Sequence, residues 1–235
     1  MALDPYKALD YFNLDDQFSE EELMIRDAVR TWTSERFVPI IGEHFEAGTF
    51  PMELVPELGE LGVFGCTFPE KYGCAGLNST TYGLICQELE RGDSGLRSFV
   101  SVQGSLVMYP IFTFGTEEQR MEWLPKLASG EAVGCFGLTE PDFGSNPSGM
   151  LTTAVKTAAG FRLNGTKQWI TNGSIADVAV VSRGSGFAGD LAVATRCPVL
   201  VLTATAPLRL PLASACIAWD GGDQAAAALR GSINL

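Results

Sequence analysis

The feature that most constrains the fold of this chain is a change of pattern near Ala132. Upstream, Ser19-Glu-Glu-Glu22 and Thr116-Glu-Glu-Gln119 read as capping boxes, in which two side chains satisfy free N–H groups at a helix start. Downstream, short apolar runs alternate with Gly, Pro and Asn turns, which is typical of strands. A helical half followed by a β half predicts an α+β fold.

The first capping box is followed by apolar residues at helical spacing. Met24, Ala28 and Trp32, with Ile25 and Val29 beside them, form a stripe that we expect to face the core. Further helices are predicted over residues 52–61, 79–91 and 96–107, the last stopping short of Pro110, and from 116 to about 130. Strands are predicted over residues 132–138, 150–157, 161–163 and 177–181.

The composition changes again after Arg183. Residues 184–235 contain twelve alanines but no lysine, glutamate, histidine or tyrosine, and prolines interrupt their apolar runs. Shifted reading frames of GC-rich DNA give such Ala-, Arg- and Pro-rich peptide, so one hypothesis is an irregular, frameshifted tail. The other is a genuine, divergent tail. Resequencing the gene would separate the two.

Composition excludes several classes of protein. The net charge of −12 argues against a nucleic-acid partner. Six cysteines without metal-ligand spacing and the single histidine, His44, argue against a metal site and fit reduced thiols. The N-terminus lacks a secretory pattern, and the apolar segment 198–219 contains Pro207, Arg209 and Pro211, which argues against a membrane span. We therefore expect a cytoplasmic protein.

Two segments carry most of the functional information. Cys135-Phe-Gly-Leu-Thr-Glu-Pro-Asp-Phe-Gly-Ser145 is a glycine-rich polar turn, and Leu163-Asn-Gly-Thr-Lys-Gln-Trp-Ile-Thr-Asn172 places a tryptophan and a threonine on what we expect to be a following strand. A planar ligand needs backbone donors along its polar edge, a hydroxyl or two, and an aromatic side chain against its face. The pair suits such a ligand; an ordinary β-hairpin domain with a buried Trp is the alternative.

Both segments resemble the flavin-contacting strands of the acyl-CoA dehydrogenases, with the glutaryl-CoA dehydrogenases as the nearest branch. The resemblance runs from about Asp15 to about Val181. It implies an all-helical domain over residues 1–130 and a barrel-like β domain, of which residues 131–183 are an incomplete part. It also implies FAD as cofactor, contacted by Phe136, Gly137, Leu138, Thr139, Ser145, Trp169, Ile170 and Thr171. One departure is Asn146, where the family usually has Asp.

A third segment, Glu90-Arg-Gly-Asp-Ser-Gly-Leu-Arg-Ser98, resembles the stretch that distinguishes glutaryl-CoA dehydrogenases. The resemblance implies that Arg97 pairs with the distal carboxylate of the substrate, because a guanidinium matches a carboxylate bidentately. Ser98 and Ser101 would assist, Glu90 would position the cluster, and Ser145 would contact the CoA part of the substrate. The alternative for Arg97 is a solvated arginine near a helix start.

The catalytic base of the family is missing from this sequence. Its glutamate comes from a C-terminal helical domain, and no glutamate follows Glu140, which we interpret as a structural residue of the Thr-Glu-Pro turn. We therefore expect the chain as given to be truncated and inactive. An intact relative would oxidise and decarboxylate glutaryl-CoA to crotonyl-CoA, pass electrons to an electron-transferring flavoprotein and form a homo-oligomer. The alternatives are a dehydrogenase for a plain acyl chain, and a non-catalytic remnant or flavin- or acyl-CoA-binding module.

Overall fold

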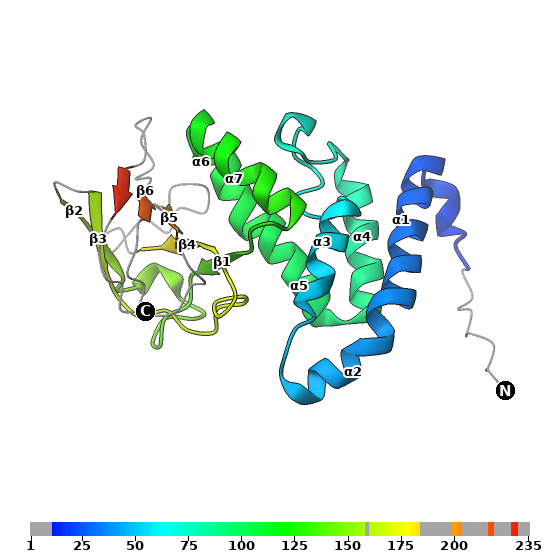
Figure 1. The fold of residues 1–235 in the computed structure, drawn as a ribbon, viewed down its shortest axis with the longest axis horizontal. Coiled ribbons are helices and arrows are strands. Elements are labelled where there is room, and N and C mark those ends of the chain that lie inside the picture. The colour runs from blue at the N-terminus through cyan, green and yellow to red at the C-terminus, as the bar shows by residue number, and fades with distance from the viewer. Residues whose placement is uncertain (1–10, 158–159, 184–198, 204–215, 219–226, 230–235) are drawn as a thin grey trace.

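The computed structural model describes residues 11–157, 160–183, 199–203, 216–218 and 227–229. Its helices form one end of the molecule and its strands the other, with β1 leading from the first part into the second (Figure 1). This arrangement confirms the α+β fold, with a helical N-terminal part and a small sheet. Most of the predicted tail, 184–235, lies outside the described residues.

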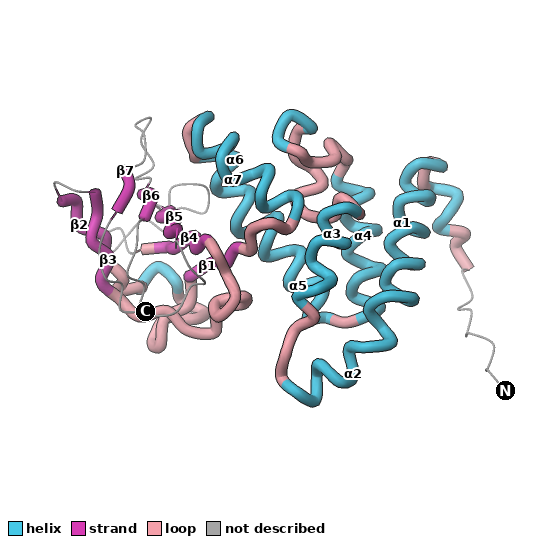
Figure 2. The backbone as a smooth tube through the Cα atoms, viewed as in Figure 1, coloured by secondary structure: helices cyan, strands magenta, loops and turns pink. Residues whose placement is uncertain are grey.

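The helices occupy the chain up to Ser129 (Figure 2). The α-helices are α1 (Glu20–Trp32), α2 (Val38–Ala47), α3 (Val55–Glu60), α4 (Ser79–Gly92), α5 (Ser94–Ser101), α6 (Tyr109–Phe114) and α7 (Glu117–Ser129). Two π-helical segments are η2 (Thr33–Phe37) and η5 (Val102–Met108), and the short 3-10 turns are η1 (Leu14–Gln17), η3 (Met52–Leu54), η4 (Glu70–Tyr72) and η6 (Pro147–Gly149). Both predicted capping boxes are present, at Ser19 and at Thr116.

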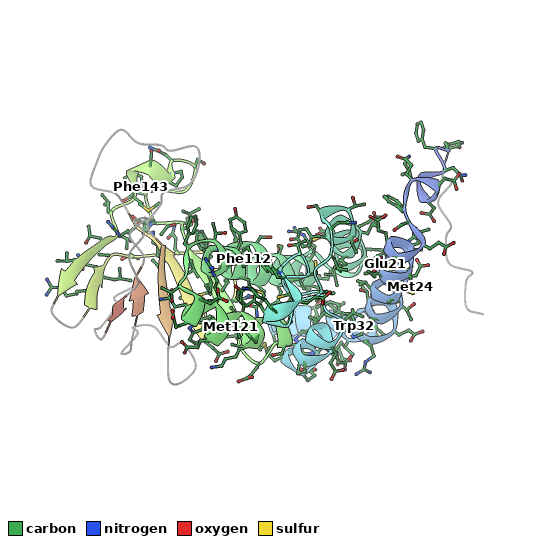
Figure 3. All side chains as sticks on the ribbon, turned by 90° about the horizontal axis from the view of Figure 1, so that it is seen from above. Glu21, Met24, Trp32, Phe112, Met121 and Phe143 are labelled. Carbon is green, nitrogen blue, oxygen red and sulfur yellow. The ribbon has the colours of Figure 1, made fainter. Side chains whose placement is uncertain are left out.

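The buried face of α1 leaves out two residues of the predicted stripe. Met24 is 66% exposed and Ala28 is exposed, whereas Val29 is buried and Trp32 packs against the core. Figure 3 labels Met24 and Trp32 on this helix at one end of the molecule. Because α1 packs mainly against α4, a single narrow face is covered, and Met24 lies outside it.

The helix predicted to stop before Pro110 continues through it. Residues 94–114 are helical throughout, as α5, η5 and α6. In the π segment the N–H of Tyr109 bonds to the carbonyl of Gly104, five residues earlier. Proline inside an α-helix lacks an N–H and clashes with the preceding turn, and the wider π turn relieves that conflict. The prediction of a helix end was therefore wrong.

The strands are β1 (Gly134–Gly137), β2 (Thr153–Thr157), β3 (Gly160–Asn164), β4 (Val178–Ser182), β5 (Val199–Thr203), β6 (Cys216–Ala218) and β7 (Ala227–Leu229). One sheet has the order β1-β4-β5-β6-β7, and β2 pairs with β3 in a second. Only the β1–β4 pairing of the described strands is parallel. Since the described part of the first sheet has two edges, β1 and β7, its closure into a barrel stays a prediction.

One buried side chain joins the helical part to the sheet. The amide nitrogen of Gln103, on η5, donates to the carbonyls of Leu127 and Ala132 at 3.0 and 2.7 Å. Its amide oxygen accepts from the N–H of Gly134 at 2.8 Å. Gln103 is fully buried, so no water can replace these bonds. The amide therefore fixes the start of β1 against η5.

We predict that Gln103→Leu lowers the free energy of unfolding by about 2–4 kcal/mol, because it leaves buried backbone groups without partners. Urea unfolding followed by circular dichroism measures the change. The matched control is Gln87→Leu on the exposed face of α4, which should shift stability by no more than about 0.5 kcal/mol. Equal stability of the two variants would contradict the role assigned to Gln103.

Candidate functional site

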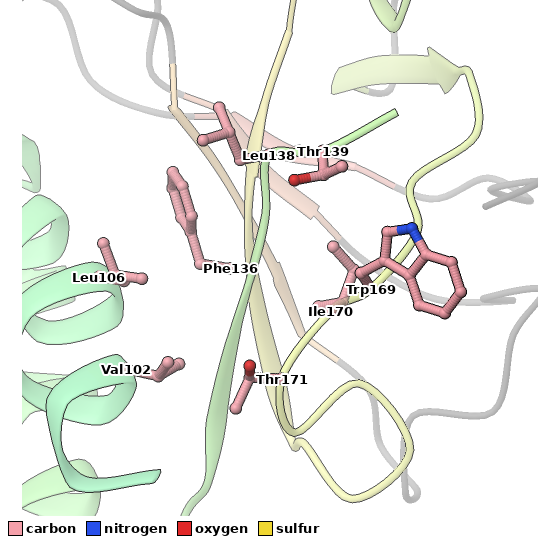
Figure 4. A pocket seen from close by; sticks show the side chains of 8 residues that line it. All are labelled: Val102, Leu106, Phe136, Leu138, Thr139, Trp169, Ile170 and Thr171. Atoms are coloured by element: carbon pink, nitrogen blue, oxygen red, sulfur yellow. The ribbon is translucent and has the colours of Figure 1, made fainter. Parts of the chain in front are cut away.

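A pocket lies between η5, β1 and the loop that precedes β4 (Figure 4). Val102 and Leu106 form the helical side and β1 runs through the middle. The lining residues are Val102, Leu106, Phe136, Leu138, Thr139, Trp169, Ile170 and Thr171. Six of the eight residues predicted to contact the cofactor therefore line one pocket, although they come from segments about 30 positions apart. Val102 and Leu106 were not predicted.

The pocket is lined by apolar side chains together with two hydroxyl groups. Phe136 and Leu138 supply apolar surface, and Thr139 and Thr171 supply hydroxyl groups. Among the described strands, β1 lies at the edge of its sheet and pairs with β4 alone, so the backbone N–H and C=O groups on its other edge face away from that sheet. Such groups require partners. The site therefore offers both aromatic contact and backbone hydrogen bonds to a planar ligand.

Trp169 lies in a loop and not on a strand as predicted. Its backbone is left-handed, with φ of 59°, and Asn172 three positions later is left-handed too, with φ of 64°. A strand cannot accommodate these conformations. The indole is 85% exposed and extends away from the helical side of the pocket. A large exposed aromatic on a strained backbone is a feature that clusters at ligand sites.

A buried ion pair lies beneath the same loop. The Lys167 Nζ donates to Glu140 Oε1 at 2.8 Å and to the carbonyl of Leu138 at 2.9 Å. Glu140 also accepts from the backbone N–H groups of Leu151 and Thr152. The side chains of the pair are 0% and 4% exposed. Glu140 is thus structural, as the sequence analysis interpreted it, while the role of Lys167 was missed.

The charge of Glu140 is stabilised despite its burial. Burial by itself raises the pKa of this carboxyl, but the hydrogen bonds from Lys167 and from the backbone at Leu151 and Thr152 outweigh burial and lower the pKa to about 2. The pair is therefore ionic at neutral pH, and it anchors the turn after β1 to the segment that starts β2.

The two remaining predicted cofactor residues lie outside the pocket lining. Gly137 is buried in β1, and a Cβ atom added there would come within 3.3 Å of the Lys167 Cγ. Ser145 is exposed in the turn between β1 and β2. A contact of either residue with a cofactor stays a prediction.

The predicted substrate cluster forms on α4 and α5. The Arg97 Nε donates to Glu90 at 2.6 Å, and its Nη1 donates to Ser101 at 3.3 Å. The hydroxyl of Ser101 donates in turn to the carbonyl of Ser98. The bond from Arg97, with a second one from Ser94, lowers the pKa of Glu90. Arg97 does not line the pocket. Val102 does, and Ser98 lies one helical turn before it.

Among the described residues, no group of three or more His, Cys, Asp or Glu side chains could hold a metal ion. The described helices include none that is both long and apolar enough to cross a membrane.

Comparison with known families identifies both halves of the chain. Residues 19–131 match the acyl-CoA dehydrogenase N-terminal domain, and residues 135–205 match the acyl-CoA dehydrogenase middle domain. The chain belongs to the acyl-CoA dehydrogenase family. The resemblance noted in the sequence is confirmed, and the middle-domain match extends past residue 183, where the sequence analysis placed the start of the tail.

Individual acyl-CoA dehydrogenases agree with this assignment. The chain is 37% identical to a probable acyl-CoA dehydrogenase of Bacillus subtilis over 196 residues, which is 80% of this chain and 51% of the relative. It is 36% identical to the glutaryl-CoA dehydrogenase of Desulfococcus multivorans over 71% of this chain and 44% of that protein. It thus spans about half the length of these relatives.

A solved acyl-CoA dehydrogenase structure matches the fold. A glutaryl-CoA dehydrogenase from Mycobacterium smegmatis, in complex with FADH2, is 42% identical and superimposes with a TM-score of 0.76. The match covers 93% of this chain and 56% of the solved one. The relatives of the chain include flavin-binding proteins, and several of the solved structures are glutaryl-CoA dehydrogenases.

We predict that the Glu140–Lys167 pair makes the chain acid-sensitive. The pKa of Glu140 is lower in the folded state, so the unfolded state binds the proton more readily and stability falls as the pH drops below 4.5 toward about 2. The loss should be roughly 2–3 kcal/mol. The double variant Glu140→Gln/Lys167→Met should lose less stability over the same range. Urea unfolding at several pH values tests this, and parallel curves for both proteins would contradict it.

Proposed function

We propose that the pocket between η5, β1 and the Trp169 loop binds the isoalloxazine ring of FAD. The support is the convergence of Phe136, Leu138 and Thr139 with Trp169 and Thr171 on one pocket, in a family whose solved members include an FADH2 complex. The free edge of β1 and the Thr139 hydroxyl would bond the polar edge of the ring. The Trp169 loop would contact its other side.

The residues present fit a flavin. The Trp169 indole is exposed although its backbone is held in a strained conformation, which leaves a flat aromatic surface for a second ring. Two threonine hydroxyls, with backbone groups on the edge of β1 away from β4, match a ring with several hydrogen-bonding atoms. The chemistry that bound FAD supplies in this family is the two-electron oxidation of an acyl-CoA at its α and β carbons. The protein contributes binding, orientation and exclusion of water.

We further propose that the substrate is glutaryl-CoA. Arg97 has five N–H donors, and its bonds to Glu90 and Ser101 use two of them, which leaves three for a distal carboxylate. The guanidinium is held in place by these partners before any ligand binds. A distal carboxylate can accept from these remaining N–H donors, whereas a neutral acyl tail offers them no acceptor, which favours the dicarboxylic thioester over a plain acyl chain.

The 235 residues would bind without turning over substrate. Removal of the α-proton requires a base within hydrogen-bond reach. No glutamate follows Glu140 in the sequence, and Glu140 itself is occupied by Lys167 and two backbone N–H groups. The chain as printed is therefore proposed to act as a flavin- and acyl-CoA-binding half of a dehydrogenase.

The intact activity would be the oxidative decarboxylation of glutaryl-CoA to crotonyl-CoA. An electron-transferring flavoprotein is the proposed electron acceptor, and the matches to this chain include a solved structure of that name from Acidaminococcus fermentans. A homo-oligomer remains part of this proposal. The alternative substrate class is a plain acyl-CoA, as in the short-chain specific enzymes of rat and cattle that are 34% and 35% identical.

We predict that the purified chain shows a bound-flavin absorbance spectrum when FAD is added and excess is removed. Trp169→Ala should weaken FAD binding by about five- to 150-fold, since stacking on an aromatic contributes about 1–3 kcal/mol. Trp32→Phe in the helical part is the control and should bind normally. The FAD-loaded chain should leave a redox dye unreduced with glutaryl-CoA. Retention of no flavin would overturn the cofactor proposal; rapid dye reduction would overturn the lack of turnover.

We predict that Arg97→Ala weakens binding of glutaryl-CoA by about tenfold or more but leaves butyryl-CoA unchanged, because only the first ligand carries a distal carboxylate. Isothermal titration of both thioesters to the FAD-loaded chain measures the difference. Arg91→Ala is the control, because that arginine is on α4 and pairs with Glu88. An unchanged preference for glutaryl-CoA in Arg97→Ala would count against the assigned role.

A further inference from the structure

The Lys167–Glu140 pair connects two segments that line the pocket, residues 136–139 and residues 169–171. Lys167 bonds the carbonyl of Leu138, which belongs to the β1 wall, and it lies two residues before Trp169, which belongs to the loop wall. Between them, the N–H of Gln168 donates to the carbonyl of Thr139 at 2.9 Å. Two consecutive residues of the loop are thus bonded to Leu138 and Thr139, the two residues that follow β1.

Neither charged side chain lines the pocket. Both side chains are more than nine-tenths buried, and neither is among the lining residues. The stem of Lys167 passes Gly137, where a Cβ would come within 3.3 Å of its Cγ. A glycine at this point in β1 leaves the room in which the lysine reaches Glu140.

Glu140 fixes the position of the ammonium group. Its carboxylate accepts from Leu151 and Thr152 as well as from Lys167, and its own backbone forms a two-way bridge with Phe143. The carboxylate therefore belongs to a rigid turn, because three hydrogen bonds and a bridge restrain it. A buried carboxylate that is held by several hydrogen bonds also fixes the position of the ammonium group that donates to it.

We propose that Lys167 and Glu140 are positioning residues for flavin binding: they set the spacing between Leu138–Thr139 and Trp169 without touching the ring. The inference rests on the proposed FAD site. Loss of the pair should therefore lower FAD affinity by more than any change in global stability explains, because the bond between Lys167 and Leu138 no longer holds the two lining segments together.

The test compares three variants of the full chain. Glu140→Gln/Lys167→Met removes both charges together, so that no unpaired buried charge remains. Lys167→Arg keeps the charge but replaces a compact ammonium by a broad, planar group. The control is Glu88→Gln, which removes another buried carboxylate, one that accepts from Arg30 and Arg91 in the helical part.

Two measurements are made on each protein at a temperature where it is folded. FAD affinity is taken from a flavin fluorescence titration. The indole N–H signal of Trp169 is followed by NMR without FAD and is assigned with Trp169→Phe. We expect the double variant and Lys167→Arg to bind FAD about tenfold more weakly or worse and to shift the Trp169 signal. Glu88→Gln should lower the thermal midpoint but leave affinity and signal unchanged.

The outcomes separate this inference from the cofactor proposal. Wild-type affinity in a folded pair variant, or equal weakening in Glu88→Gln, would overturn the positioning role. If the unaltered chain binds no FAD, the cofactor proposal fails. The NMR signal then tests the structural part alone: a shift confined to the pair variants shows that the pair positions the Trp169 loop, and an unmoved signal overturns that role as well. If the double variant does not fold, Lys167→Arg decides by the same criteria.

Discussion

The buried amide of Gln103 is the interaction on which the arrangement of this molecule depends. It bonds Leu127 near the end of α7, Ala132 two residues before β1, and Gly134 at the start of β1, and so sets where the sheet begins relative to η5. Because η5 and β1 are opposing walls of the pocket, the same three bonds define the width of the site. A buried polar side chain with all its hydrogen bonds made favours one packing arrangement over alternative ones.

The π segment η5 serves both the fold and the site. Its wide turn carries the helix past Pro110, and its outward side chains Val102 and Leu106 face β1 across the pocket. On its inner side the same segment buries Gln103 and packs Gly104 against Gly65. π-helical turns are costly and are retained mostly at functional places. Here the wider turn also changes which residues of the helix point in one direction, and Val102 and Leu106 both reach the pocket.

Much of the fold and part of the site could be predicted from residue patterns. Capping boxes marked α1 and α7 because their bonds are local, and the motif residues around Thr139 and Trp169 did converge on one pocket. What local patterns could not give was the partner of Lys167, since Glu140 lies 27 residues away. A lysine in a polar loop has the same local pattern whether it is solvated or buried. Its position just before the tryptophan motif was the one available signal.

Local patterns also failed where backbone strain decides the structure. The left-handed conformation of Trp169 costs roughly 1–2 kcal/mol relative to an ordinary one, and nothing in a Trp-Ile-Thr sequence signals it. Such a conformation persists only where surrounding contacts hold the backbone in place. Those surroundings are the charged bonds of Lys167 and the Gln168–Thr139 bond, immediately before the indole. In the proposed flavin site the exposed ring and the buried lysine therefore have linked roles: the ring would supply the contact surface, and the bonds of Lys167 and Gln168 hold the segment that carries it.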